Sequence, residues 1–178
     1  EQKARAKSAS TFGIDYNKEL KITENTVFTG YDSLSSEGKI THIFKDGAEV
    51  DSIATDENAV IVLDKTPFYG EMGGQVGDKG VITIGENARF IVEDTKHVAK
   101  ATIHVGRVDI GEFDKNATVN ATVDAKVRAE IAKHHSATHL LDAALRQVIG
   151  DSVAQKGSYV DDTKLRFDYS HSQPLTAT

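Results

Sequence analysis

The sequence contains no cysteine, no tryptophan and only two prolines among its 178 residues. Without cysteine, these residues supply neither a disulfide nor a thiolate metal ligand, so a bound metal must rely on nitrogen and oxygen. There is no run of eighteen apolar residues, and no apolar signal region follows the charged N-terminal residues EQKARAKSAS. We therefore expect a cytoplasmic protein with no membrane partner, folded as one ordinary domain or two small ones.

The charge balance is acidic, with a formal net charge of −6. Nucleic-acid-binding proteins are usually basic, because Lys and Arg supply most of the affinity for phosphates. The excess of acid lies in residues 1–120, whereas residues 121–178 carry seven basic and seven acidic side chains and four of the seven histidines. We expect no DNA partner. The neutral second part is compatible with local contact to RNA, although its charge is no evidence for it.

Short β-rich runs fill the sequence from about Val27 to Val123. Turn residues such as Asp46–Gly47 separate them, and few helical stretches intervene. The runs are TVFTGY, KITHIF, AEVDSI, AVIVLD, GVITIG, ARFIVED, ATIHVGRV and ATVNATV. Roughly eight strands at this close spacing favour a small antiparallel β-barrel or sandwich over a parallel sheet.

One long helix is predicted from Ala125 to Ile149. Apolar residues recur there at helical intervals, Asp124 precedes the stretch as a typical N-cap, and Gly150 follows it as a typical stop. The two histidines at 134 and 135 leave open whether the stretch is one helix or two shorter ones. Strand-like runs then return in SVAQKGSYV and KLRFDYS, which the turn-like pair Asp161–Asp162 joins.

These elements predict an α+β chain in three parts. Residues 1–12 combine good helix formers with no N-cap, which indicates the end of a preceding helix or linker. Residues 13–120 form the barrel, which includes a glycine-rich motif. Residues 121–178 combine the helix with strands, and because they stop without a complete element we expect this second unit to be truncated.

The segment HHSATHLL contains two histidines, His135 and His139, at an i, i+4 spacing. On a helix these side chains share a face one turn apart, so both imidazoles can reach one cation. The alternative is a pair of surface or core histidines. Metalloprotease chemistry is disfavoured, because Ser136 stands where that motif requires glutamate. Zinc needs three or four protein ligands, and no spacing singles out any of the other histidines, which are His42, His97, His104, His134 and His171.

Residues 134–171, HHSATHLLDAALRQVIGDSVAQKGSYVDDTKLRFDYSH, resemble the start of the editing core of alanyl-tRNA synthetases. That fold is shared with free-standing alanyl-tRNA editing proteins and with the editing domain of threonyl-tRNA synthetases. The run TPFYGEMGGQVGDKG resembles the glycine motif of the same family, and RAKSASTFGIDY resembles the linker before the editing region of its bacterial members. The resemblance thus covers nearly the whole chain.

The resemblance implies a ligand set and a set of substrates. In that family zinc is held by the two histidines of H-x-x-x-H, which His135 and His139 match, and by a later C-x-x-x-H pair that we expect beyond Thr178. A half-site of two histidines should bind zinc weakly or not at all. The implied partners are tRNA-Ala and mischarged Ser-tRNA and Gly-tRNA. ATP and magnesium belong to an aminoacylation domain expected before residue 1.

By the same resemblance Thr138 matches the threonine thought to recognise serine, and Gln155 matches a pocket glutamine important for deacylation. On a helix the Thr138 hydroxyl shares a face with the two histidines and can hydrogen-bond a serine side chain. The alternative is a threonine that bonds the helix backbone. The Gln155 amide can orient water or the ester carbonyl, and the alternative is an ordinary exposed strand glutamine.

Several residues are candidates for contacts with tRNA. Arg166 and Lys156 can bind phosphates near the tRNA end, or can be solvated strand charges. In the glycine motif the candidates are Gly73, Gly74 and Gln75. That motif lacks the ending of a P-loop and the strand-to-helix context of a dinucleotide site, so we expect tight turns or a close backbone approach there instead. Its neighbours Phe68 and Tyr69 can stack on a base or belong to the core.

The preferred function is therefore the editing region of an ATP-dependent aminoacyl-tRNA ligase. Two alternatives remain. A free-standing editing hydrolase of the same fold is disfavoured by the linker-like N-terminus, and a non-catalytic barrel that only positions RNA would leave the histidine pair without a role.

Overall fold

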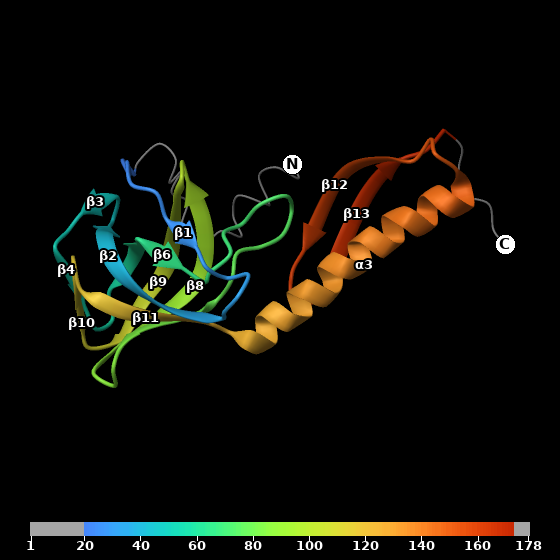
Figure 1. The fold of residues 1–178 in the computed structure, drawn as a ribbon. Helices are drawn as coiled ribbons and strands as arrows, with labels where there is room; N and C mark the ends of the chain where they lie inside the picture. Colours follow the sequence, from blue (N-terminus) through green and yellow to red (C-terminus); the bar gives the residue numbers. More distant parts are fainter. Residues whose placement is uncertain (1–19, 173–178) are drawn as a thin grey trace.

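The computed structural model describes residues 20–172. The predicted helix end or linker at residues 1–12 and the last six residues of the predicted second unit lie outside this range. In Figure 1 a β-barrel occupies one end of the molecule, and a single long helix runs away from it with a two-stranded hairpin alongside.

The barrel is small and antiparallel, as the close spacing of the β-rich runs predicted. Its strands pair in the order β11-β7-β8-β9-β5-β2, and β11 returns to pair with β2, which closes the barrel. The six strands are β2 (Ser35–Lys45), β5 (Asn58–Leu63), β7 (Gly80–Ile84), β8 (Ala88–Val98), β9 (Ala101–Ile110) and β11 (Thr118–Val123). Closure leaves these strands without a free edge over most of their length.

Five short strands lie outside the closed barrel. The predicted strand AEVDSI is divided into β3 (Ala48–Glu49), which pairs with β2, and β4 (Ser52–Ala54), which pairs with β10 (Glu112–Asp114). Of TVFTGY only β1 (Val27–Phe28) is a strand, and it pairs in parallel with β6 (Lys65–Thr66). The sequence pattern did not predict β6 or β10 because two or three residues are too few to show an alternation.

Strand β5 contains a continuous run of apolar residues. Ile61 and Leu63 belong to the main core inside the barrel, whereas Val60 and Val62 belong to a second buried cluster on the other face. Leu20 and Ile22 join that second cluster. Because both faces of the strand are covered, the alternation of polar and apolar residues expected of a half-exposed strand is absent.

His104 on β9 lies in the barrel interior and is fully buried. Its Nδ1 is 2.9 Å from the Ile61 carbonyl oxygen, and its Nε2 is 2.8 Å from the Thr66 hydroxyl. The edge of the ring meets Phe68, with 5.1 Å between ring centroids. Burial lowers the pKa of His104 to about 4, since the charged form loses its hydration. The barrel therefore folds around a neutral imidazole.

Acid should destabilise the barrel through His104. Its pKa in the folded state lies below the value of 6.5 expected when unfolded, so the unfolded chain takes up the proton first. The stability is fully present above pH 6.5 and is lost as the pH falls toward 4, by on the order of 3 kcal/mol. Denaturant unfolding measured across this range should show the loss, and the variant His104→Gln should show a shallower dependence. Equal slopes in the two proteins would contradict the assignment.

The predicted helix is present as α3 (Ala125–Ile149), with no break at His134 or His135. The Asp124 carboxylate accepts hydrogen bonds from the backbone N–H groups of Lys126 and Val127, as an N-cap does. At the other end the Gly150 N–H donates to the Arg146 carbonyl. Among residues 20–172 no helix combines the length and apolar character needed to cross a membrane.

Arg128, in the first turn of α3, fastens the helix to the barrel. Its guanidinium forms an ion pair with Asp78, whose side chain has no exposed surface. Arg128 also donates to the carbonyl oxygens of Gly30 (3.3 Å) and Pro67 (3.0 Å). Asp78 accepts a further bond from the Tyr69 N–H at 2.7 Å. The start of the helix is thus fixed to three segments that precede it in the chain.

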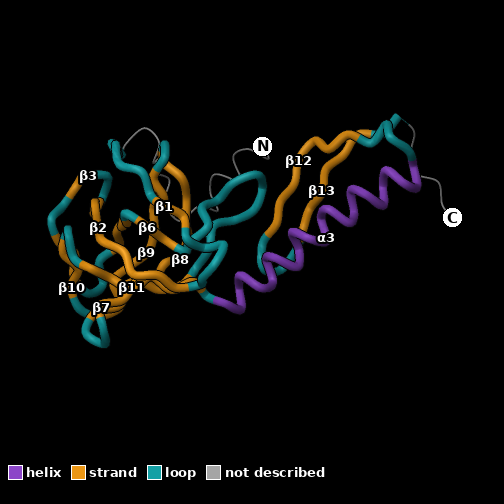
Figure 2. The backbone as a smooth tube through the Cα atoms, viewed as in Figure 1, coloured by secondary structure: helices purple, strands orange, loops and turns teal. Residues whose placement is uncertain are grey.

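After the helix, β12 (Ala154–Val160) and β13 (Leu165–Ser170) pair antiparallel, as the sequence predicted. A bulge between Gln155 and Gly157 leaves Lys156 without a partner in the register. Figure 2 shows this hairpin lying along α3 beyond the barrel, with a loop from the barrel reaching toward it. That loop contains the glycine motif.

Candidate functional site

The two histidines on α3 point at each other. The Nε2 atoms of His135 and His139 are 3.0 Å apart, and their ring centroids are separated by 4.9 Å. Both residues are exposed at the helix surface. At this distance one Nε2 donates a hydrogen bond to the other, and imidazole nitrogens are ligands that a first-row divalent metal such as zinc accepts. The residue types and their spacing therefore fit half of a metal site.

A cavity of about 130 Å³ adjoins the histidine pair. It is lined by residues from three segments, which are the glycine motif, α3 and the hairpin. The lining residues are Gly73, Gln75, His135, Thr138, His139, Asp142, Gln155, Ser158, Val160 and Phe167. The structure thus brings together the two predicted metal ligands, His135 and His139, and the two pocket residues implied by the resemblance, Thr138 and Gln155.

The glycine motif reaches this cavity as a narrow hairpin-like arm, residues 69–78, which we call the glycine arm. At its base the Asp78 N–H donates to the Tyr69 carbonyl at 2.9 Å. At its tip Met72 and Gln75 exchange two backbone hydrogen bonds across Gly73 and Gly74, whose φ angles are 61° and 88°. Two positive φ angles in succession define a type I′ turn, for which glycine is the least strained residue.

The tip of the glycine arm joins the edge of β12. The Val160 N–H donates to the Gly74 carbonyl at 2.8 Å, and the Val76 N–H donates to the Val160 carbonyl at 3.0 Å. A Cβ atom on Gly74 would lie 2.3 Å from the Ser158 carbonyl oxygen. The close backbone approach expected from the density of glycines is therefore present at Gly74, and it connects the barrel to the hairpin, as the green loop in Figure 1 shows.

Thr138 lies between the two histidines and is 9 % exposed. Its hydroxyl donates to the His134 carbonyl at 2.8 Å, the backbone bond weighed as an alternative role. The hydroxyl hydrogen is used in that bond, but the lone pairs of the oxygen can still accept a bond from a hydroxyl in the cavity. Gln155 is exposed on β12 and borders the same cavity. Both side chains are thus within the site.

Arg166 and Lys156 lie on the hairpin and are exposed, and neither borders the cavity. Arg166 pairs with Asp168 at 3.1 Å on the same strand. Of the candidates in the glycine motif, Gly73 and Gln75 line the cavity, and Gly74 lies against Ser158. Phe68 is fully buried, which assigns it to the core, whereas Tyr69 is half-buried and contacts the Phe28 ring edge-on.

Four of the other histidines have partners of their own. His104 is in the barrel core, and His134 is 2.7 Å from the Asp161 carbonyl through its Nδ1. His42 lies 3.3 Å from Glu24, and His171 lies 3.1 Å from the Ser152 hydroxyl. Within residues 20–172 no three side chains of His, Asp or Glu are grouped as metal ligands.

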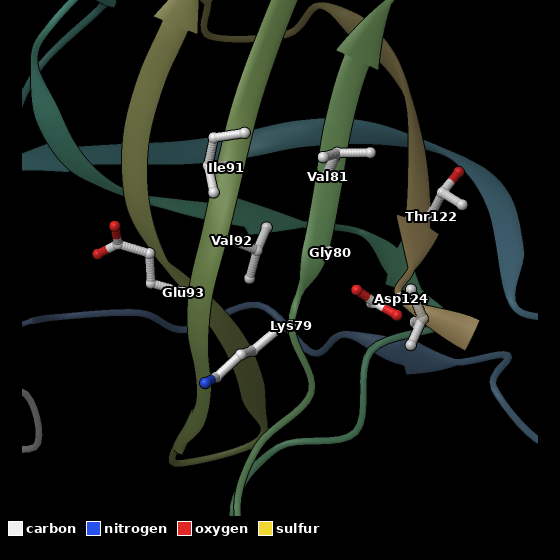
Figure 3. A pocket seen from close by; sticks show the side chains of 9 residues that line it. Lys79, Gly80, Val81, Ile91, Val92, Glu93, Thr122 and Asp124 are labelled. Atoms are coloured by element: carbon white, nitrogen blue, oxygen red, sulfur yellow. The ribbon is translucent and has the colours of Figure 1, made fainter. Parts of the chain in front are cut away.

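A larger hollow, of about 520 Å³, lies on the outside of the barrel where β7, β8 and β11 meet the start of α3. Figure 3 shows its apolar floor, with Val81 and Ile91 among the labelled side chains, and the charged groups Lys79, Glu93 and Asp124 around it. No histidine lines it. The smaller cavity is therefore the better candidate, because polar groups converge there from separate elements.

The barrel has a recognisable family. The model of the family described as tRNA synthetases class II (A) matches residues 1–127, which is more than half of the chain. The chain belongs to this class II tRNA synthetase family. Membership implies a ligase of the aminoacyl-tRNA synthetase kind, with a role in protein biosynthesis and with tRNA as its partner. The match ends three residues into α3, so the histidine pair and the hairpin lie outside it.

Sequence reasoning missed two contacts between the glycine motif and α3. Gln75 was predicted as a tRNA contact, and its side-chain Oε1 also accepts a hydrogen bond from His135 Nδ1 at 2.8 Å. Asp78 was assigned no role, although it anchors Arg128. The glycine motif was the available signal for both, since Gln75 and Asp78 lie within it, but their partners on α3 are 60 and 50 residues away.

Proposed function

We propose that this chain carries part of the editing region of an alanine-specific member of the family, acting in the cytoplasm. There, the site would hydrolyse Ser-tRNA and Gly-tRNA that were charged in error. One observation supports the proposal above the others. His135, His139, Thr138 and Gln155 border a single cavity although they come from two different elements, and these are the residues that match the editing core of alanyl-tRNA synthetases.

The chemistry gives a reason for such a site. A synthetase pocket that accepts alanine cannot strongly exclude glycine, and it rejects serine poorly, because one small group changes binding by only roughly 1–3 kcal/mol. A second, hydrolytic site removes the wrong products. Zinc, when bound, would lower the pKa of a water molecule or orient the aminoacyl ester. His135 and His139 would hold it through their Nε2 atoms, and the remaining ligands are proposed to lie beyond Thr178.

The other two residues have separate roles in the proposal. The Gln155 amide would orient water or the ester carbonyl at the cavity wall. The Thr138 oxygen would accept a hydrogen bond from the hydroxyl of a seryl group, while its own hydrogen remains on the His134 carbonyl. An alanyl group has no hydroxyl to donate, so the correct product would gain nothing from Thr138. Arg166 and Lys156 are proposed to bind phosphates of the tRNA from the exposed face of the hairpin.

Thr138→Val is the variant that tests this role. Valine keeps the shape of threonine but removes the oxygen, so deacylation of Ser-tRNA-Ala should fall by about 10–100-fold, the range that one buried polar contact provides. Deacylation of Gly-tRNA-Ala should change little, because glycine has no side chain. Both rates would be measured on the full-length gene product. Equal losses on the two substrates would contradict the role of Thr138 in recognising serine.

Two alternatives stay distinct from this proposal. A free-standing editing hydrolase would deacylate the same substrates but would carry no aminoacylation domain, which the gene sequence before Glu1 would reveal. A barrel that only positions RNA would bind tRNA without deacylating it, and changes at Gln155 would then leave every measured rate unaffected. Deacylation of Ser-tRNA-Ala that depends on Gln155 therefore separates the editing proposal from the RNA-positioning one.

A further inference from the structure

Gln75, at the tip of the glycine arm, contacts the first of the two histidines. Its Oε1 is 2.8 Å from His135 Nδ1. A carbonyl oxygen can only accept a hydrogen bond, so the hydrogen of the neutral imidazole must lie on Nδ1. The lone pair of His135 is then on Nε2, the atom that faces His139 at 3.0 Å. The contact with Gln75 selects the tautomer that presents Nε2 as a donor to a metal.

We propose that Gln75 is a positioning residue that fixes the tautomer and ring orientation of His135. The metal role of His135 rests on the proposed function, whereas its tautomer is a property of this chain alone. Histidine ligands of metals usually donate their second ring N–H to an oxygen acceptor, and this bond holds the ring in place and increases the basicity of the ligating nitrogen. Gln75 supplies that oxygen here.

The histidine pair needs such a support because both residues lie on an exposed helix surface. An exposed imidazole is otherwise free to change rotamer and tautomer, which costs conformational entropy when a ligand fixes it. The bond from Gln75 constrains the ring before a ligand arrives. Ile131, one turn before His135, is buried and contributes to the packing of the helix.

The backbone of Gln75 is itself well fixed. Gln75 pairs with Val160 in a parallel bridge and with Met72 in an antiparallel one. The flanking Gly74 and Val76 both bond to Val160. A side chain that starts from a backbone held on two sides can aim its oxygen at a fixed point. The glycine arm therefore extends from the barrel to the histidines, and the type I′ turn at Gly73–Gly74 places Gln75 at its end.

The test replaces Gln75 in the 178-residue chain and observes the histidine directly. Long-range ¹H–¹⁵N spectra of the imidazoles, recorded well above the ordinary pKa of histidine, distinguish the two neutral tautomers. The wild type should show His135 with its hydrogen on Nδ1. Gln75→Leu should shift His135 toward the Nε2–H form, and Gln75→Glu, whose carboxylate also accepts, should restore the wild-type pattern. Gln147→Leu, at an exposed glutamine late in α3, serves as the matched control and should change nothing.

Titration of the full-length gene product with Zn²⁺ alone gives a second readout. Gln75→Leu should weaken zinc binding about 10–100-fold, and Gln75→Glu should retain it. An Nε2–H tautomer in the wild type, or the same tautomer in wild type and Gln75→Leu, would overturn the positioning role, as would equal zinc affinities for these two proteins. A different result would contradict the proposed function. A tautomer that responds to Gln75 in a chain whose zinc binding does not require His139 would support the positioning role and contradict the metal site.

Discussion

Replacement of Arg128 by methionine is expected to lower the free energy of unfolding by about 3–5 kcal/mol. The variant leaves Asp78 in a site without solvent exposure and without its cationic partner. It also removes the donors that bond to the Gly30 and Pro67 carbonyls. The buried carboxylate then keeps the Tyr69 N–H as a donor but has no cation to offset its desolvation. Urea denaturation, followed by the signal of the barrel and of the helix, would measure the loss.

The matched control is Arg146→Met. Arg146 pairs with Asp142 at 3.1 Å on the exposed surface of the same helix, and such a pair contributes less than about 1 kcal/mol. The double variant Asp78→Asn with Arg128→Met should recover part of the stability, because no buried charge is left unpaired. If Arg128→Met lowered the free energy of unfolding no more than Arg146→Met does, the ion pair would not anchor the helix to the barrel.

Loss of His139 is expected to reduce deacylation of Ser-tRNA-Ala by at least about 100-fold in the full-length gene product. A residue that only orients a metal ligand already affects metal affinity or activity by about 10–100-fold, so a ligand itself should matter more. In His139→Ala the remaining deacylation should no longer respond to added zinc. The rate of aminoacylation with alanine should be retained, since it depends on a separate domain in the proposed function.

His171→Ala is the comparison for that variant. His171 follows β13, bonds to the Ser152 hydroxyl and does not line the cavity, so its loss should leave deacylation unchanged. His135→Ala should resemble His139→Ala. Deacylation that persists in both histidine variants would show that the pair is not part of the hydrolytic site, even if the fold and the tRNA partner remained as described.

Local patterns predicted much of the fold. The cap residues Asp124 and Gly150 gave both ends of α3, because each acts on the backbone groups of its own helix. The turn pair Asp46–Gly47 is also present, with φ angles of 51° and 80°. The short barrel strands followed from β-rich runs between turn residues. These features depend on neighbours in sequence, which a single sequence displays.

The contacts that complete the site were not predicted, because they depend on which distant segments meet. The glycine motif does not predict that Gln75 contacts His135, which lies 60 residues later in the chain. The same holds for Asp78 and Arg128, an ordinary pair of opposite charges until the fold buries one of them. The four site residues His135, His139, Thr138 and Gln155 were identified by resemblance to a family, and their spacing alone left the surface alternatives open.

The attachment of α3 at Arg128 also makes the helix a lever. His135 lies seven residues further along, about 10 Å away at the rise of an α-helix. A tilt of about 5° at the attachment would therefore displace its imidazole by roughly 1 Å, and a misplacement of that size can cost about 100-fold in rate. The tip of the glycine arm contacts the helix at His135 itself. The contact with the glycine arm would thus limit errors of alignment between barrel and helix at the imidazole itself.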